Sequence, residues 1–322
     1  MADARLVADD LVVTFPVVDG RLLRAVDGVS LRVGPGQILG LVGESGCGKT
    51  TAARCMAGLR APHSGEVRLD GVPLPARRTV GQRRAIQLIF QDPYSSLNPR
   101  LTVRRMLREL LAVHKLAPPD AMEDRCRELM SLVGLPAAAL DGLPGQFSGG
   151  QRQRIAIARA LAVEPQVLIA DEPVSALDVS VQATILRLFA DLRDQLGLSM
   201  IIISHNLAVV RQLSDDVAVM YLGRVVEQAP ADDFFGSVRH PYARALLTAA
   251  PRLSQRDLVS PGLRGEPPSP VDLPSGCRFH PRCPQAADIC RAADPALLPV
   301  RPASPHLVSC HFGTDAAIRS EE

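Results

Sequence analysis

The feature that most constrains this chain is a glycine-rich loop that follows an apolar run and precedes a segment suited to a helix. The loop reads Gly43-Glu44-Ser45-Gly46-Cys47-Gly48-Lys49-Thr50, with Thr51 next, and matches G-x-x-x-x-G-K-[ST] in full. Glycines let backbone N–H groups close around a phosphate, and the following helix points its positive end at the anion. We expect Lys49 to neutralise phosphate oxygens and Thr50 to offer a hydroxyl to Mg²⁺. The loop therefore predicts a site for Mg²⁺ and a nucleoside triphosphate, since a glycine turn that binds nothing needs neither side chain.

Three apolar runs of strand length predict the centre of a sheet. Residues 38–42, 167–170 and 200–203 carry no charge, as expected for parallel strands covered on both faces. The phosphate loop follows the first run, Asp171 and Glu172 follow the second, and Ser204 and His205 follow the third. Ligands of open α/β sheets sit outside the carboxyl ends of the strands, so we expect these residues to converge. The fold class is therefore α/β, with a phosphate-loop core and a mostly parallel sheet.

The polar residues at the strand ends suit hydrolysis of a terminal phosphate. We expect Asp171 to hold Mg²⁺ directly or through water, and Glu172 to accept a proton from attacking water. His205 is placed to bond the γ-phosphate and orient that water. Each residue has a structural alternative, because acidic pairs often stabilise helix N-termini and a lone histidine often satisfies a local contact. The phosphate loop upstream favours the catalytic interpretation.

Other segments indicate further layers. Residues 5–42 alternate in short stretches that predict an N-terminal antiparallel β subdomain, with turns at Asp19-Gly20 and Gly34-Pro35-Gly36. Residues 101–145 change to helical spacing and predict an α-helical insertion. Ser148-Gly149-Gly150-Gln151 then opens another helix, which Pro165 ends. Ser148 suits the N-cap, so this second helix N-terminus offers another half-site for phosphate, although an ordinary capped helix also explains the local pattern.

Charge and hydropathy exclude some classes of function. The 322 residues carry a net charge of +2, so no global field argues for nucleic acid. The sequence has no apolar run long enough for a membrane-spanning helix and no secretory pattern at its N-terminus. We expect a cytosolic chain that meets a membrane through a partner.

Taken in chain order, these motifs resemble the ATP-binding cassette (ABC) subunits of transporters over roughly residues 10–225. The resemblance rests on the phosphate loop, Gln91 at a strand end, Ser148-Gly149-Gly150-Gln151, Asp171-Glu172, Ser175-Ala176-Leu177-Asp178 and His205. It implies ATP as the nucleotide, Gln91 as a further Mg²⁺ and catalytic contact, and Phe15 stacked on adenine, although a strand Phe also suits a core. It implies further that two subunits pair head to tail, with ATP between the phosphate loop of one and the Ser148–Gln151 signature of the other, next to Asp178.

A narrower resemblance is to the ATPases of dipeptide and oligopeptide importers. It rests on residues 90–100, on His240-Pro241-Tyr242 and on the tail around Gly276-Cys277. It implies peptide uptake, with nickel or another small solute as the alternative, at the cytoplasmic face of the cell membrane. The implied partners are a second, related ATPase, two transmembrane permeases and an extracytoplasmic solute-binding protein, with no nucleic acid. A soluble ABC ATPase would predict a long coiled coil or two cassettes, neither of which is present, and the tail weighs against an exporter.

The C-terminal part is set apart by proline and cysteine. We expect residues 1–254 to form the nucleotide-binding domain, with a helical subdomain at about 95–155, and residues 255–322 to form a Pro-rich linker and an irregular metal-binding tail. In a reducing compartment, cysteines so grouped suggest metal before disulfides; they are Cys277, Cys283, Cys290 and Cys310. The resemblance implies a [4Fe-4S] cluster, which four thiolates fit, and Zn²⁺ with help from His280 or His311 is the alternative. Cys47 is interpreted as a small residue in a tight loop, or else as a thiolate favoured by Lys49 and the helix N-terminus.

Overall fold

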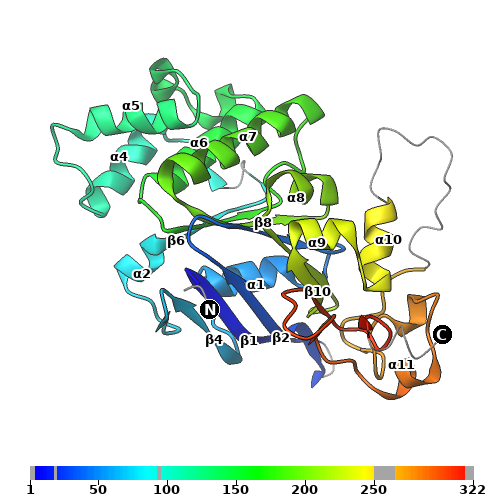
Figure 1. Cartoon of the computed structure of the whole chain (residues 1–322). Coiled ribbons are helices and arrows are strands. Elements are labelled where there is room, and N and C mark those ends of the chain that lie inside the picture. Colours follow the sequence, from blue (N-terminus) through cyan, green and yellow to red (C-terminus); the bar gives the residue numbers. More distant parts are fainter. Residues whose placement is uncertain (1–3, 18–19, 93–95, 250–264, 316–322) are drawn as a thin grey trace.

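A mixed sheet forms the centre of the molecule in the computed structural model, which describes residues 4–17, 20–92, 96–249 and 265–315 (Figure 1). Its strands lie in the order β11-β12-β10-β9-β3-β8-β7-β6. Strands β6, β7, β8, β3 and β9 run parallel, and β10, β12 and β11 continue the sheet in antiparallel fashion. The bounds are β3 Ile38–Val42, β6 Ile86–Ile89, β7 Val167–Asp171, β8 Ser199–Ser204, β9 Asp216–Tyr221, β10 Arg224–Pro230, β11 Leu298–Pro299 and β12 Leu307–Val308.

The three apolar runs of the sequence are the central strands β3, β7 and β8, and every residue in these strands is buried. The prediction of central parallel strands is confirmed. In the register, Val42 lies opposite Ser204, and Asp171 lies opposite Ile203. The carboxyl ends of the three strands therefore meet at one edge, where the phosphate loop begins.

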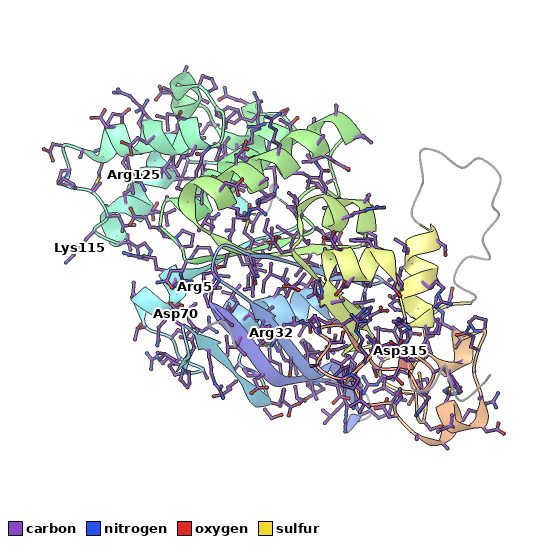
Figure 2. The ribbon with its side chains drawn as sticks, viewed as in Figure 1. Arg5, Arg32, Asp70, Lys115, Arg125 and Asp315 are labelled. Carbon is purple, nitrogen blue, oxygen red and sulfur yellow. The ribbon has the colours of Figure 1, made fainter. Side chains whose placement is uncertain are left out.

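A second, antiparallel sheet confirms the predicted N-terminal β subdomain. Its order is β2-β1-β4-β5, with bounds β1 Leu6–Pro16, β2 Leu22–Val33, β4 Ser64–Leu69 and β5 Val72–Pro73. Helix α1 (Lys49–Met56) contacts strands of both sheets, so the two sheets share one core around it. At the outer side of this layer Arg5 forms an ion pair with Asp70 at 2.9 Å (Figure 2).

The predicted helical insertion is present as a group of helices on the side of the main sheet away from β1, β2 and β4 (Figure 1). Thr102 caps its first helix by accepting a hydrogen bond from Arg105 N, and Arg104 joins that helix to Asp141 at 2.9 Å. The helices that follow β7 and β8 cover the same face. The helical elements are α2 Val80–Ala85, α4 Val103–Val113, α5 Met122–Leu132, η2 Ala137–Asp141, η3 Pro144–Gln146, α6 Gly149–Leu161, α7 Val179–Leu196, α8 Leu207–Leu213, α9 Ala231–Gly236, α10 Pro241–Ala249, η4 His280–Arg282 and α11 Asp288–Ala292.

Among the residues described, no helix combines the length and the apolar character needed to cross a bilayer.

The C-terminal tail, expected to be irregular, packs closely against strands of both sheets. Strand β12 pairs with β10 and so extends the main sheet, and Phe279 packs in the core beside Tyr221 and Tyr242. Arg278 reaches Asp27 on β2 in a buried ion pair. The predicted boundary at residue 254 lies outside the described residues, as do parts of the predicted linker, of the turn at Asp19-Gly20 and of the segment at 90–100.

A buried carboxylate fastens the same junction. Glu227 on β10 is 0% exposed and accepts hydrogen bonds from the backbone N–H groups of Arg239 at 2.8 Å and His240 at 2.7 Å. Its Oε1 also lies 2.7 Å from His306 Nε2 in the tail. A buried carboxylate is tolerated where donors surround it, so Glu227 joins the strand, the start of α10 and the tail.

Candidate nucleotide site

The phosphate loop is shaped by glycines that pack against neighbouring backbone. Gly48, the N-cap of α1, has φ +107°, and a Cβ there would lie 2.0 Å from the carbonyl oxygen of Ala25. A Cβ on Gly43 would lie 2.2 Å from the carbonyl oxygen of Met220. Lys49 Nζ donates to the carbonyl oxygens of Gly43 and Glu44, each at 2.8 Å. The backbone of the loop therefore curls around the Lys49 ammonium group. A residue larger than glycine at position 43 or 48 would collide with the neighbouring backbone.

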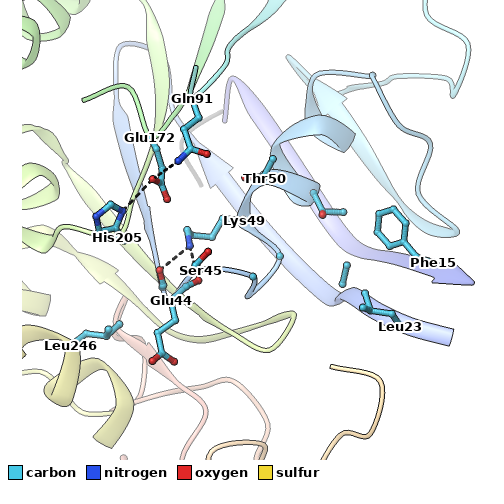
Figure 3. A pocket seen from close by; sticks show the side chains of 15 residues that line it. Phe15, Leu23, Glu44, Ser45, Lys49, Thr50, Gln91, Glu172, His205 and Leu246 are labelled. Carbon is cyan, nitrogen blue, oxygen red and sulfur yellow. Dashed lines mark hydrogen bonds and ion pairs between the residues drawn. The ribbon is translucent and has the colours of Figure 1, made fainter. Parts of the chain in front are cut away.

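A cavity of about 800 Å³ opens over this loop (Figure 3). This volume is within the range of small-molecule sites. The structure brings nearly all the predicted ATP-binding and catalytic residues to its wall, together with Leu23, Ala25 and Leu246, which the sequence reasoning missed. The predicted residues that line it are Phe15, Gly43, Glu44, Ser45, Gly46, Gly48, Lys49, Thr50, Thr51, Gln91, Glu172 and His205.

One end of the cavity carries a polar group centred on Glu172. Glu172 Oε2 accepts a hydrogen bond from Gln91 Nε2 at 3.0 Å and lies 3.2 Å from His205 Nδ1 (Figure 3). Its backbone has φ +47°, an uncommon conformation for a side-chain-bearing residue, and its N–H donates to Ile203 O at 3.0 Å. Such strain persists where the surroundings over-determine it. Three residues from three strand ends thus place a carboxylate between an amide and an imidazole.

Asp171, the last residue of β7, faces Thr50 at the start of α1. It is 4% exposed, its carboxylate accepts a hydrogen bond from the Thr50 hydroxyl, and burial raises its pKa. Within the described part of the chain, Asp171 Oδ1 has no hydrogen-bond partner. A buried carboxylate oxygen without a donor, next to the Thr50 hydroxyl, supplies the hard oxygen ligands that Mg²⁺ prefers. These residues therefore fit the predicted Mg²⁺ site.

Phe15 lines the cavity with one ring face covered by an arginine. The guanidinium carbon of Arg60 lies 3.8 Å from the centroid of the Phe15 ring. A cation over an aromatic face is attracted by the ring quadrupole. The sequence carried no signal for this contact, because Arg60 lies after α1 in a stretch without a motif.

Cys47 is buried behind the loop and is not among the side chains that line the cavity. Burial raises the pKa of its thiol, although neighbouring Lys49 opposes the shift. The thiolate alternative is therefore not supported, and the small-residue interpretation fits the packing. A Cβ on Gly43 would come within 2.8 Å of Cys47 Sγ.

The second predicted half-site is a capped helix N-terminus packed against α7. Ser148 caps α6, with Gln151 N donating to Ser148 Oγ at 3.4 Å and Ser148 N donating to Gln151 Oε1 at 3.0 Å. A Cβ on Gly150 would lie 2.5 Å from Val181 Cγ1, so the glycine allows the close approach of the two helices. Asp178 is the N-cap residue of α7. None of these residues lines the 800 Å³ cavity, as expected if they serve a second subunit.

The four C-terminal cysteines lie near one another without forming a finished ligand set. In the described ranges, no group of three or more His, Cys, Asp or Glu side chains is arranged to hold a metal ion. Burial and, to a smaller extent, the other three thiols raise the pKa of Cys277 to about 11. Backbone N–H groups two residues on donate to the sulfurs of Cys277, Cys283 and Cys310 and oppose the effect of burial. The four thiols are therefore neighbours, and the metal centre stays a prediction.

Comparison with known proteins agrees with this geometry. The sequence profile of the ABC transporter family matches residues 26–175, and that of the oligopeptide/dipeptide transporter C-terminal region matches residues 226–290. A peptide ABC transporter ATP-binding protein of Sinorhizobium fredii (strain NBRC 101917 / NGR234) is 45% identical over 98% of this chain and 92% of its own length. A peptide import ATP-binding protein of Brucella abortus (strain 2308) is 47% identical over 94% of this chain and 92% of its own length.

Solved structures share the fold. The subunit cbiO1 of Clostridium perfringens, part of the ABC transporter complex cbiONQ, has a TM-score of 0.65 and 30% identity, covering 73% of this chain and 92% of its own. The ATP-binding cassette MJ0796, solved as a dimer in a post-hydrolysis state with ADP and Pi, has a TM-score of 0.63 and 27% identity, covering 70% and 98%. With its phosphate loop, acidic strand end and capped α6 in the same order, the chain belongs to the ATP-hydrolysing subunits of ABC transporters, in the group that carries the oligopeptide/dipeptide transporter C-terminal region.

Proposed function

We propose that this chain uses ATP hydrolysis to power the uptake of peptides through a membrane transporter. The observation that carries the proposal is the position of Glu172, held by Gln91 and His205 at the wall of the cavity that the phosphate loop lines. The peptide substrate is supported by the names of the relatives and by the C-terminal region. Nickel or another small solute is the alternative.

The residues of the cavity divide the chemistry between them. Loop N–H groups and Lys49 bind the phosphate oxygens, while Thr50, Asp171 and Gln91 would hold Mg²⁺, which when bound neutralises charge on the β- and γ-phosphates. Glu172 takes the proton from the attacking water, and Gln91 and His205 hold that carboxylate in place. Phe15 provides a ring for adenine opposite the face that Arg60 covers.

We propose that Ser148, Gly149, Gly150, Gln151 and Asp178 complete the ATP site of a second cassette subunit. The capped α6 N-terminus suits γ-phosphate oxygens, and because its residues do not line this chain's own cavity, we infer that they serve a partner. The second ATPase, two permeases and a solute-binding protein form the rest of the proposed assembly. The chain then lies peripherally at the cytoplasmic face of the membrane, with residues of about 95–155 toward the permeases.

We propose further that Cys277, Cys283, Cys290 and Cys310 bind a [4Fe-4S] cluster, with Zn²⁺ as the alternative. Four neighbouring thiols, three of which accept a backbone N–H, suit thiolate ligands, because such bonds stabilise the charged form. Iron, sulfide and zinc are to be measured on protein purified without oxygen. Cys283→Ser should lose most of the metal, and an unchanged metal content would remove Cys283 from the ligands.

The catalytic assignment is tested by Glu172→Gln in the assembled transporter. This variant should keep ATP binding and lose about 10²–10⁴-fold in turnover, the usual contribution of a general base. Glu66→Gln, a change at a partly exposed side chain on β4 away from the cavity wall, is the matched control and should leave turnover unchanged. Residual hydrolysis near the wild-type rate would contradict the role of Glu172.

The biological assignment is tested by purifying the chain from its native membrane and identifying what accompanies it. Two permeases, a second cassette ATPase and a solute-binding protein would support peptide or solute import. Ribosomes or DNA in their place would overturn it and leave the ATP chemistry alone.

A further inference from the structure

The second residue of the phosphate loop is held by the C-terminal region. Arg282 Nη1 donates to Glu44 Oε2 at 2.7 Å, and Arg282 Nη2 donates to Glu44 Oε1 at 3.0 Å. Glu44 N donates to the hydroxyl of Tyr242 at 2.8 Å. The carbonyl oxygen of the same residue accepts a hydrogen bond from Lys49 Nζ. Glu44 therefore connects the tail and α10 to the lysine that binds phosphate.

The groups that hold Glu44 are themselves fixed by packing. The side chain of Arg282 is 4% exposed, and its guanidinium carbon lies 5.9 Å from the ring centroid of Tyr221. The Tyr221 and Tyr242 rings pack with centroids 4.6 Å apart, and Phe279 lies 5.3 Å from Tyr221 and 5.4 Å from Tyr242. Two parallel hydrogen bonds from a buried guanidinium define direction as well as distance. The contact thus fixes the position of the loop rather than merely covering it.

The ion pair between Arg282 and Glu44 also affects the net charge at the cavity wall. Glu44 lines the cavity beside Lys49, at the end where the anionic phosphates of ATP would bind. An unpaired carboxylate there would repel a triphosphate, and Arg282 neutralises it from the side that faces the protein. Loss of Arg282 would therefore release the loop and also add a negative charge next to the ligand.

We propose that Arg282 is a positioning residue for the phosphate loop, acting through Glu44, so that the C-terminal region sets the affinity of this cassette for ATP. The proposal rests on the nucleotide site described above and is independent of the transported solute. It gives the tail a part in ATP binding through its own side chains.

The test measures binding of a fluorescent ATP analogue with Mg²⁺ to the full chain. Arg282→Met should weaken binding about tenfold, equivalent to about 1.4 kcal/mol. Arg282→Lys keeps the charge but loses the paired geometry, so it should fall between Arg282→Met and wild type. Arg291→Met is the matched control, since Arg291 lies in the same tail, pairs with exposed Asp288 and should leave the affinity unchanged. Glu44→Gln combined with Arg282→Met removes the repelling charge and should recover part of the loss.

Kinetics in the assembled transporter separate positioning from simple damage. With Arg282→Met, KM for ATP should rise while kcat at saturating ATP stays near wild type. If that variant does not fold, Tyr242→Phe, which removes one oxygen, replaces it and should also weaken binding of the analogue.

The outcomes distinguish the two levels of inference. If the wild-type chain fails to bind the analogue, the nucleotide site itself is wrong. If the wild type binds it and the folded Arg282 and Tyr242 variants bind equally well, or if kcat falls with KM unchanged, the positioning role is overturned.

Discussion

Replacing Gly48 with alanine tests how tightly the phosphate loop is packed on strand β2. At φ +107° an alanine is strained, which costs about 1–3 kcal/mol. Its Cβ would also lie 2.0 Å from Ala25 O and 2.8 Å from Met220 Cε. The methionine can turn aside, but the carbonyl belongs to a paired strand, so relieving the overlap should cost a further 1–3 kcal/mol, roughly the range for overpacking.

Gly46 in the same loop is the matched control. Its φ is +78°, yet a Cβ there would have no neighbouring heavy atom within 4 Å. Gly46→Ala should therefore bear the cost of backbone strain alone. The difference between the two variants isolates the contact with β2, which we expect to be about 2 kcal/mol.

Thermal unfolding without nucleotide or Mg²⁺ is the assay. For a large domain about 1 kcal/mol shifts Tm by roughly 2–4 °C, so Gly48→Ala should unfold at least about 4 °C below Gly46→Ala. Midpoints that agree to about 1 °C would refute the packing argument, because both variants share the strained backbone and differ in the overlap.

Three further predictions concern other parts of the molecule. Burial raises the pKa of Asp171, so the charged carboxylate destabilises the folded state wherever the pH is above the ordinary aspartate pKa. Asp171→Asn should therefore raise Tm at about pH 7 and leave it unchanged at about pH 3. Mg²⁺–ATP should raise the Tm of this variant less than that of the wild type. Gly150→Ala should destabilise the chain by about 1–3 kcal/mol in urea unfolding, and Val181→Ala in the same chain should restore most of it. Asp27→Ala should lower the free energy of unfolding by about 3–5 kcal/mol, because it leaves the Arg278 guanidinium buried without its carboxylate. The tail of this variant should be cut faster in limited proteolysis. The double variant Asp27→Ala, Arg278→Met should be cut more slowly than the single variant.

Sequence reasoning reached the phosphate loop, the central strands and the capped α6 because each depends on local patterns. Glycine spacing, apolar runs and Ser148 before a helix are visible within a few residues. The convergence of Glu172 and His205 followed from one general rule about the ends of parallel strands.

The features that the sequence did not predict depend on contacts between residues far apart in the chain. Glu44 and Arg282 are separated by 238 residues, and no local pattern assigns one to the other. Tyr242 was visible as part of a motif, but its role as an acceptor for Glu44 N required the packing of α10 against the loop. The stacking of Arg60 on Phe15 likewise depends on how the end of α1 meets β1.

The position of β3 within the sheet has a consequence for how the chain is made. Strand β3 ends at Val42, yet its neighbours on both sides, β8 and β9, lie between residues 199 and 221. At about 5–20 residues per second, the ribosome needs roughly 8–30 s to supply the first of them. Strand pairings between residues so distant in sequence form slowly. Strand β3, which leads into the phosphate loop, therefore stays unpaired in the main sheet until β8 and β9 have been synthesised. A fragment released before β8 therefore carries the phosphate-loop sequence without the sheet that gives it shape.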